Sequence, residues 1–393
     1  MPRPALLVDS GFSAAPIFRA AERHRWSMAV IGNNPDAYLH RLTDQSHHED
    51  YSLPAALAAI VEEHGYKALI PGCTDASYLS CAHIAADFGF PGIDTLENTR
   101  RILTKSGFRQ LCEQLMVPAP TSFTPETALQ QSSGVIVKPV DAHSGQGITS
   151  LKKGDKTALR RALDKARAQS AGGEAVIESL VEGQLFSTSL FVRNRKPVRS
   201  FLVEEHCLRD SYAVSVSRVV EETPGENRSA VEQDLLKIAN HLKLVDGLLH
   251  LQWIEGNNDR YWHIELTRRC PGDLYARLIE LSTGFDYAAA YAAPFLGRHI
   301  EEDCTSTRDD PVNVRRFTVL GKPGSVLENL RFASAQAPLE FHPLIPVGGR
   351  IGATGRAGIL FCPIDEEADN PETAEEAHAL SYYIQTREPG ERA

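Results

Sequence analysis

The sequence predicts a chain of mixed class, α/β at its start and α+β beyond it, and three observations support this. Across residues 1–100, short apolar runs such as ALLVD, MAVIG and KALIPG alternate with helical patterns such as LPAALAAIVEEH, the rhythm of a parallel sheet with crossover helices. From about residue 121 strand-like runs dominate, with helices expected at 156–169 and 230–243. The 393 residues exceed what one hydrophobic core usually spans, so two or three domains are expected.

Proline and capping residues indicate where several helices begin. Pro16, with Ser13 as its cap, is expected to begin the first helix, and Pro54 another. The run SAVE at 229–232 has the spacing of a capping box. Asn370, directly before a proline and an acidic turn, is expected to cap the last helix.

Composition excludes several classes of function. The net charge of −10 argues against a protein that neutralises a nucleic-acid backbone, although a single nucleotide remains a suitable ligand. The seven cysteines show no CxxC spacing, which indicates reduced thiols and a cytoplasmic location. Because no apolar run approaches roughly 18 residues and the N-terminus lacks a signal-peptide pattern, we expect neither a membrane partner nor export.

The stretch VIVKPVDAHSGQGITSL, residues 135–151, places a lysine before a glycine-containing loop. A P-loop has the opposite order, with its lysine after the glycines. Lys138 ends an apolar run, and HSGQG joins it to a second extended run. This order predicts a β-hairpin whose tip brings backbone N–H groups over an anion, with the ammonium at its base. A solvated lysine at a strand end is the alternative.

A second hairpin is predicted in LLHLQWIEGNNDRYWHIELTRR. With the turn at Asn257 and Asn258, Glu255 pairs with Arg260 and every cross-strand pair of residue numbers sums to 515. That register places Leu249, Leu251, Trp253, Trp262, Ile264 and Leu266 on one face, and His250, Gln252, His263 and Glu265 on the other. Two oxygen ligands on the polar face could share a cation, whereas any solvated sheet would also show such a face.

Together these segments resemble the ATP-grasp superfamily, over nearly the whole chain. The resemblance implies an ATP-grasp fold with a Rossmann-like pre-ATP-grasp domain at 1–100. The ATP-grasp domain would span 101–300, with a lid subdomain at about 121–182. A small C-terminal subdomain, 301–393, would complete the grasp, and related proteins suggest a homodimer.

The resemblance also implies a nucleotide site. Lys105 and Lys138 would contact the phosphates under the mobile HSGQG tip, while Glu178 and the backbone of Val181 would hold the adenine. The full set of expected nucleotide-binding residues is Lys105, Lys138, His143, Ser144, Gly145, Gln146, Gly147, Glu178, Leu180, Val181 and Glu182. The ribose-binding glutamate of the family is replaced by Leu185, with Glu182 or Gln184 as substitutes.

For the metal, the family pattern is a carboxylate on one strand and E-x-N-x-R on the next. This chain has Gln252 and then ELTRR, so the implied magnesium ligands are Gln252, Glu265 and Thr267. An amide oxygen is an acceptable hard ligand, but Thr267 leaves open whether one or two Mg²⁺ are held. Asp273, in RCPGD, would position the turn after Arg269.

The implied activity is that of an ATP-dependent carboxylate–amine ligase. Phosphoryl transfer from ATP to a small-molecule carboxylate would form an acyl phosphate, which an amine then attacks, releasing ADP and phosphate. Lys138 and Arg269 are the expected catalytic residues, because neutralising and aligning two anions is the main task. Two alternative functions remain open. One is a carboxylase-like enzyme that activates bicarbonate. The other is a catalytically inactive nucleotide-binding protein, which is suggested because Gln252, Thr267 and Leu185 all differ from the family pattern.

Other residues are weaker candidates for catalysis or ligand binding. Cys270 is expected to be a packed thiol, and Ser13 a helix cap rather than a nucleophile. His143 could touch phosphate or face water. Arg350 and Arg356, in GGRIGATGRAG, could bind a substrate carboxylate or be exposed turn residues.

Overall fold

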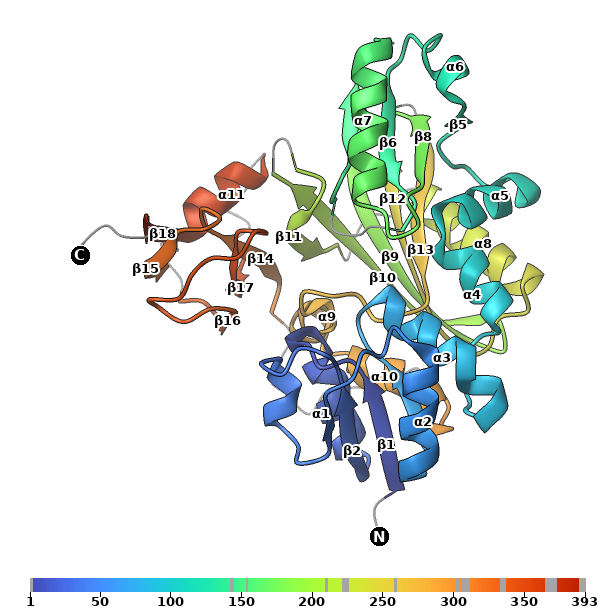
Figure 1. The fold of residues 1–393 in the computed structure, drawn as a ribbon, viewed down its shortest axis with the longest axis vertical. Helices are drawn as coiled ribbons and strands as arrows, with labels where there is room; N and C mark the ends of the chain where they lie inside the picture. Colours follow the sequence, from blue (N-terminus) through green and yellow to red (C-terminus); the bar gives the residue numbers. More distant parts are fainter. Residues whose placement is uncertain are drawn as a thin grey trace.

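The computed structural model describes residues 3–141, 145–152, 155–208, 211–220, 226–257, 260–301, 304, 312–332, 337–364 and 373–388. Three regions are visible in Figure 1: an N-terminal layer below, a small sheet with its helix at the top, and a long curved sheet between them.

The N-terminal region is a parallel sheet of strand order β3-β2-β1-β4, as the alternating pattern predicts. Its strands are β1 (Arg3–Val8), β2 (Trp26–Ile31), β3 (Ser46–His47) and β4 (Ala68–Pro71). Its helices are η1 (Phe12–Ala14), α1 (Ala15–Arg23), η2 (Tyr38–Arg41), α2 (Pro54–His64) and α3 (Asp75–Phe88). Two further helices, α4 (Leu96–Leu103) and α5 (Lys105–Leu115), lead out of this region.

The small sheet has the order β5-β8-β6-β7 and its own core. Its elements are β5 (Ser122–Phe123), α6 (Pro125–Ala128), β6 (Val135–Pro139), β7 (Thr149–Leu151), α7 (Lys156–Ala168) and β8 (Ala175–Ser179). Val137 and Ile177 pack against Leu159 and Ala166 of α7. The predicted hairpin is confirmed, since Val135 pairs with Leu151 and Val137 with Thr149.

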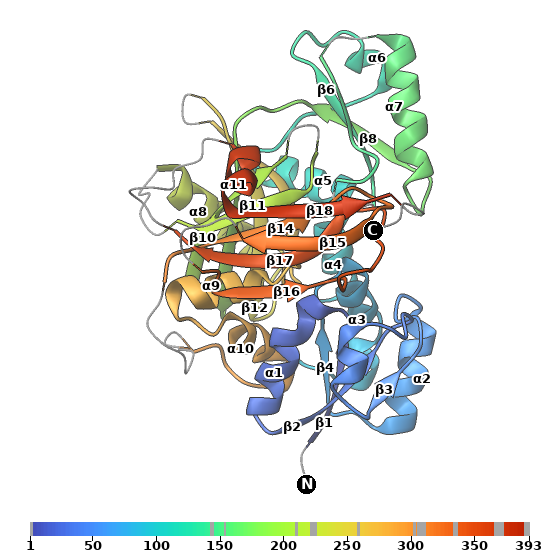
Figure 2. The same cartoon turned by 90° about the vertical axis from the view of Figure 1, so that its left-hand side faces the viewer.

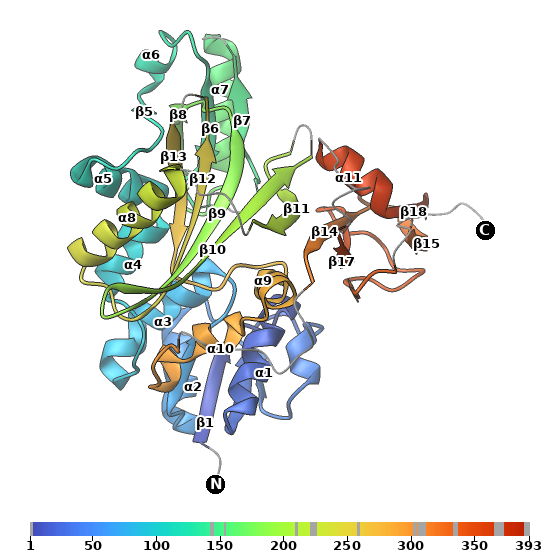
Figure 3. The ribbon, with the colours of Figure 1, turned by 180° about the vertical axis from the view of Figure 1, so that it is seen from behind.

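The long sheet has the order β13-β12-β9-β10-β11-β14-β17-β16. Its strands are β9 (Gln184–Arg193), β10 (Lys196–Cys207), β11 (Val214–Val219), β12 (Gly247–Glu255), β13 (Tyr261–Thr267), β14 (Val314–Leu320), β16 (Glu340–Pro343) and β17 (Arg356–Pro363). Helices α5 and α8 (Glu226–His241) cover one face, as Figure 3 shows. The pair β15 (Val326–Phe332) and β18 (Tyr382–Arg387) lies beside β14 and β17 with α11 (Ala374–Ser381), seen face-on in Figure 2.

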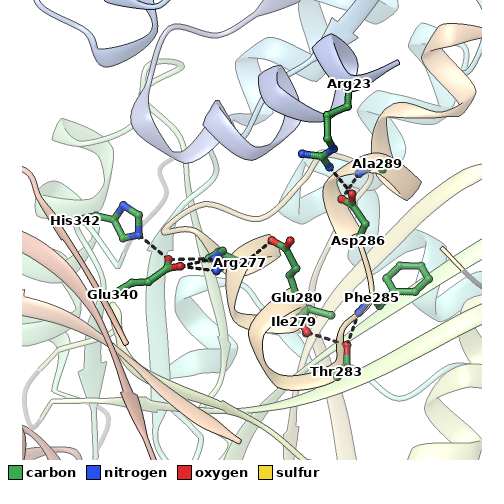
Figure 4. A network of polar contacts seen from close by, with 10 residues as sticks. All are labelled: Arg23, Arg277, Ile279, Glu280, Thr283, Phe285, Asp286, Ala289, Glu340 and His342. Carbon is green, nitrogen blue, oxygen red and sulfur yellow. Dashed lines mark hydrogen bonds and ion pairs between the residues drawn. The ribbon is translucent and has the colours of Figure 1, made fainter. Parts of the chain in front are cut away.

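The opposite face of the long sheet meets α9 (Tyr275–Thr283), α10 (Tyr287–Ala292) and η3 (Pro294–Leu296). Figure 4 shows how α9 and α10 are tied on both sides. Arg277 of α9 donates from Nε to Glu340 of β16 at 3.0 Å, and Asp286, at the start of α10, pairs with Arg23 of α1. These contacts join the sheet, the two helices and the N-terminal region across one interface.

Three predicted helix starts are wrong or differ. The Ser13 hydroxyl does not cap α1, since it accepts a hydrogen bond from the backbone N–H of Asp273 at 3.0 Å. The run 229–232 lies inside α8, which already includes residue 226. Thr373 caps α11, whereas the expected cap, Asn370, lies outside the described residues. Pro54 does begin α2, and 156–169 is helical to Ala168.

The register of the β12–β13 hairpin also differs from the prediction. Glu255 pairs with Tyr261, Trp253 with His263 and Gln252 with Glu265, so β13 carries one extra residue at Ile264. Such a bulge inverts the alternation of faces. His263 therefore lies on the α8 side, where its Nε2 is 2.9 Å from Asp234 Oδ2. Trp262, paired with Ile254, moves to the face that carries Gln252.

Within the described residues, no helix combines the length and apolar character needed to cross a membrane.

Replacing Arg268 should destabilise the contact between the sheet and the N-terminal region. This side chain is 2% exposed, pairs with Asp94 at 2.6 Å, and donates to the carbonyls of Val245 and Leu248. Arg268→Leu strands a buried carboxylate, so we expect a loss of about 3–5 kcal/mol of unfolding free energy, measured by chemical denaturation. The exposed control Arg161→Leu should change it by less than about 0.5 kcal/mol. A similarly small effect of Arg268→Leu would contradict this role.

Candidate functional site

A buried cluster of charges lies where the small sheet meets the long one. Glu178 of β8 is fully buried and accepts from Lys138 Nζ at 2.8 Å and from Arg109 Nε at 2.7 Å. Lys138, on β6 beside β8, is only 7% exposed. The alternative of a solvated lysine at a strand end is therefore wrong.

The electrostatics of this cluster follow from burial and pairing. Burial acts to raise the pKa of Glu178, but Lys138 and Arg109 together hold it below its ordinary value. Burial lowers the pKa of Lys138, and Glu178 opposes that shift. Each group thus opposes the effect of burial on the other. One carboxylate thus serves two cations, which leaves the cluster with excess positive charge.

Arg109 joins the two sheets and was missed by sequence analysis. Its Nη2 donates to the carbonyl of Ile264 at 2.9 Å, next to Glu265 on β13, while its Nε holds Glu178 of the small sheet. Its buried Nη1 has no hydrogen-bond partner within the described part of the chain. Its position four residues after Lys105 on one helix was the only signal available.

Lys105 reaches the same region from the N-terminus of α5. Its Nζ is 3.4 Å from the carbonyl oxygen of Val140, in the segment after β6. Lys105 also contributes electrostatically to lowering the pKa of Lys138, after burial and Arg109. The two lysines predicted to lie together therefore do so.

The loop after Lys138 is described in part. Gly145 and Gly147 both have φ near +72°, the left-handed region that favours glycine. A Cβ on Gly145 would lie 2.8 Å from the backbone of Tyr212, so the loop approaches the β10–β11 connection closely. Gln146 is exposed, whereas His143 and Ser144 lie outside the described residues.

The segment from Leu180 to Leu185 connects the small sheet to β9. Leu180 and Val181 are half-buried and Glu182 is exposed. The amide of Gln184 donates to the carbonyls of Leu185 and Glu205, both at 2.9 Å. Leu185 pairs with Ile254, which pairs with Trp262, so three apolar side chains form a row on one face of the sheet.

Gln252 and Glu265 are directly paired across β12 and β13, on the same face as that row. Gln252 Nε2 donates to Glu205 Oε2 at 2.7 Å, which leaves its Oε1 free to accept or to coordinate. Glu265 has no hydrogen-bond partner among the residues described. The hydroxyl of Thr267 donates to Asp75 Oδ1 at 3.2 Å.

These residues fit a Mg²⁺ site that relies on a ligand's oxygens. The described residues hold no cluster of three His, Cys, Asp or Glu side chains spaced for a metal ion. Mg²⁺ commonly binds through one or two protein oxygens together with substrate phosphates. The adjacent oxygens of Gln252 and Glu265 suit that mode.

Arg269 lies at the border with the N-terminal region. Its Nε donates to Asp75 Oδ1 at 2.7 Å. Burial acts to lower the pKa of Arg269, but Asp75 and then Glu265 raise it above its ordinary value. Asp75, the first residue of α3 after β4, was also missed by sequence analysis. The carboxyl end of a parallel strand is where such residues gather.

Asp273, in the turn after Arg269, pairs with two arginines. It pairs with Arg356 of β17, and its Oδ2 is 3.7 Å from Nη1 of Arg316 on β14. Arg316 also donates to Ser217 Oγ at 2.9 Å. Arg350 is exposed and bonds to the carbonyl of Gly324, away from this group.

Removing the charge of Glu178 should loosen the junction of the two sheets. Glu178→Gln leaves Lys138 and Arg109 buried without an anion, so we expect a loss of about 3–5 kcal/mol of unfolding free energy at neutral pH. Because the folded-state pKa of Glu178 is lowered, this difference should be full above its ordinary value of 4.5 and shrink as pH falls below it. Chemical denaturation at several pH values measures it.

The control is Glu174→Gln, an exposed carboxylate of the same sheet region. Equal stability of the two variants at neutral pH would show that Glu178 does not hold the cluster.

Proteins of related sequence match only part of this chain. No family model matches the chain. The formate-dependent phosphoribosylglycinamide formyltransferase of Burkholderia cenocepacia is 28% identical over 202 residues, 49% of this chain and 50% of that protein. The enzyme of the same name from Bordetella avium is 25% identical over 200 residues, 48% and 49% of the two chains. The chain therefore spans about half the length of the curated relatives it matches.

Solved structures match over nearly the whole chain. Phosphoribosylglycinamide synthetase from Anaerococcus prevotii superposes with a TM-score of 0.74 at 15% identity, covering 98% of this chain and 100% of that one. L-amino acid ligase from Bacillus licheniformis gives 0.76 at 14% identity, covering 98% and 99%. The biotin carboxylase domain of 2-oxoglutarate carboxylase from Hydrogenobacter thermophilus gives 0.74 at 14%, covering 98% and 91%. The chain therefore has the ATP-grasp fold.

Proposed function

We propose that the chain is an ATP-dependent, ADP-forming carbon–nitrogen ligase that joins a small-molecule carboxylate to an amine through an acyl phosphate. The observation that carries the proposal is the pair of cations, Arg109 and Lys138, on one carboxylate, Glu178, with Lys105 nearby at the Val140 carbonyl and with Gln252 paired to Glu265 on β12 and β13. Excess positive charge beside a cation site suits a triphosphate.

The nucleotide would lie between the two sheets. Lys138 and Lys105 face the phosphates, and the unpartnered Nη1 of Arg109 donates to an acceptor of the same ligand. The half-buried row of Leu185, Ile254 and Trp262 offers an apolar surface to the base. The biotin carboxylase domain that resembles this chain in fold was solved with MgADP and bicarbonate, which supports a nucleotide as a ligand here.

Gln252 Oε1 and Glu265 would hold Mg²⁺, with Thr267 as a further ligand only if its hydroxyl releases Asp75. When bound, this ion neutralises phosphate oxygens and aligns them for in-line transfer. The second step of the reaction, in which the amine attacks the acyl phosphate, needs a further cation at the site. Arg269, fixed by Asp75, provides a permanently charged donor at the edge of the sheet.

The chemistry balances in two steps. A carboxylate oxygen attacks the γ-phosphorus, the bond to ADP breaks, and an acyl phosphate forms. The amine nitrogen then attacks the acyl carbon, phosphate leaves, and the amine loses a proton. Since acyl phosphates hydrolyse, the loop containing Gly145 and Gly147 would exclude water during both steps. The domain boundaries expected above, a homodimer and a cytoplasmic location are part of this proposal.

Steady-state ADP release with panels of carboxylates and amines tests the function. We expect turnover that requires both a carboxylate and an amine. Turnover supported by bicarbonate alone would favour a carboxylase, a class represented among the similar structures. Tight ATP binding with no ADP release under any pair would overturn the ligase proposal.

Loss of Lys138 or Glu265 should abolish this turnover. Lys138→Ala removes a phosphate contact and Glu265→Ala the site's carboxylate ligand, so we expect at least about 100-fold lower kcat/KM for each, or roughly 2.7 kcal/mol. Circular dichroism checks folding, and Mn²⁺ titration followed by electron paramagnetic resonance checks cation affinity in Glu265→Ala. The exposed controls Lys67→Ala and Glu62→Ala should keep full activity. Unchanged activity in both site variants would falsify the site assignment.

A further inference from the structure

The site-facing surface of the long sheet carries a second set of polar groups, beyond the metal pair. Glu205 of β10 pairs with Ser217 of β11, which pairs with Arg316 of β14. Paired residues of antiparallel strands share a face, and three adjacent strands span about 10 Å. Through Leu185, the same row continues to the apolar surface proposed for the base.

Glu205 is a buried carboxylate without a cation. It is 4% exposed and accepts hydrogen bonds from Ser187 Oγ and Gln252 Nε2, both at 2.7 Å. No ion pair links it to any part of the chain that the structure describes. A buried carboxylate in this state is stabilised by a cationic ligand.

At the other end of the row, two guanidinium groups share one carboxylate. Arg316 and Arg356 both pair with Asp273, so two guanidinium groups have a single paired carboxylate between them. Arg316 is 3% exposed. The Nε atoms of both arginines are buried and have no partner among the residues described. Such donors suit an anionic group of a ligand.

A divalent cation is a poorer occupant for Glu205 than an ammonium group. The NH₂ of Gln252 points at Glu205, so the amide oxygen that could bind Mg²⁺ lies on its other side, toward Glu265. A metal bound to Glu205 would meet the donor end of that amide. An ammonium group has three N–H donors and fits the remaining lone pairs of the carboxylate.

We propose that this row binds the amine substrate as a small zwitterion of the amino-acid class, with its ammonium on Glu205 and its carboxylate on Arg316 and Arg356. This inference rests on the proposed ligase function. Tyr275, whose hydroxyl is 3.1 Å from Ser187 Oγ, and the turn at Asp273 border the subsite. The amine would then lie along the sheet from Gln252 and Glu265, the two residues proposed to bind Mg²⁺, where an activated carboxyl group would form.

Binding tests the proposal separately from turnover. The full-length protein with Mg²⁺ and a non-hydrolysable ATP analogue is titrated with each of the twenty L-amino acids, by saturation-transfer NMR. For each binder, the N-acetyl derivative removes the ammonium charge and the amino-acid amide removes the carboxylate. We expect at least one amino acid to bind, and at least tenfold weaker binding of both of its derivatives.

Variants assign the two ends. Glu205→Gln should abolish the preference for the amino acid over its N-acetyl form, and Arg316→Gln the preference over its amide. The matched controls are Glu204→Gln, on the opposite face of β10, and Arg350→Gln, outside the site; both should leave the dissociation constant unchanged. Melting curves identify variants that fail to fold, and Glu205→Asp, which keeps the charge, should retain part of the ammonium preference.

Three results would overturn the proposal: binding of no amino acid, an amide that binds as well as its parent, or Glu205→Gln weakening Mn²⁺ binding while amino-acid binding is unchanged. The last would make Glu205 a metal ligand. Failure of the ligase function is distinguishable, because ADP release would then be absent for every acid–amine pair whatever the binding titration shows.

Discussion

The fold depends on how one carboxylate is shared at the junction of two sheets. Glu178 ties Lys138 of its own sheet to Arg109, and Arg109 in turn holds the backbone of β13 beside Glu265. Each of these charged groups is buried so deeply that loss of its partner would strongly destabilise the fold. The same contacts that bring the small sheet to the long one therefore also bring two cations, Lys138 and Arg109, to the end of the long sheet that carries Glu265, so architecture and site arise from one interaction.

The two faces of the long sheet carry different residues, because side chains alternate along each strand. The face covered by α5 and α8 carries Leu249, Leu251 and Trp253 in the core shared with these helices. Its other face carries the apolar row at Leu185, the oxygens of Gln252 and Glu265, and the polar row ending at Arg316. The bulge at Ile264 is essential to this division, because it moves His263 to the α8 side and Trp262 to the site side.

Sequence reasoning could find what depends on local pattern. The parallel N-terminal sheet, the hairpin after Lys138 and the closeness of Gln252 to Glu265 all follow from periodicity and turn residues. It could not find contacts made across long sequence distances. A bulge leaves no mark in hydrophobic alternation, which is why the register was wrong. Ser13 had a suitable position for a cap, but its hydroxyl is used by Asp273, 260 residues away. Asp75, Arg109 and Glu205 share this property, since their partners come from distant elements.

For the ligase activity proposed above, the arrangement of charge along the site face would bring two anions together without trapping either. In the proposed function, Lys138 and Arg109, which share the carboxylate of Glu178, would attract the triphosphate. Arg269 instead pairs with Asp75, and Arg356 shares Asp273 with Arg316. A matched guanidinium keeps its orientation when no ligand is bound, because the carboxylate fixes its plane, and it still has donors to offer. Since Asp75 comes from the N-terminal region and Asp273 from the turn bonded to Ser13, both arginines are positioned by the packing of that region against the sheet.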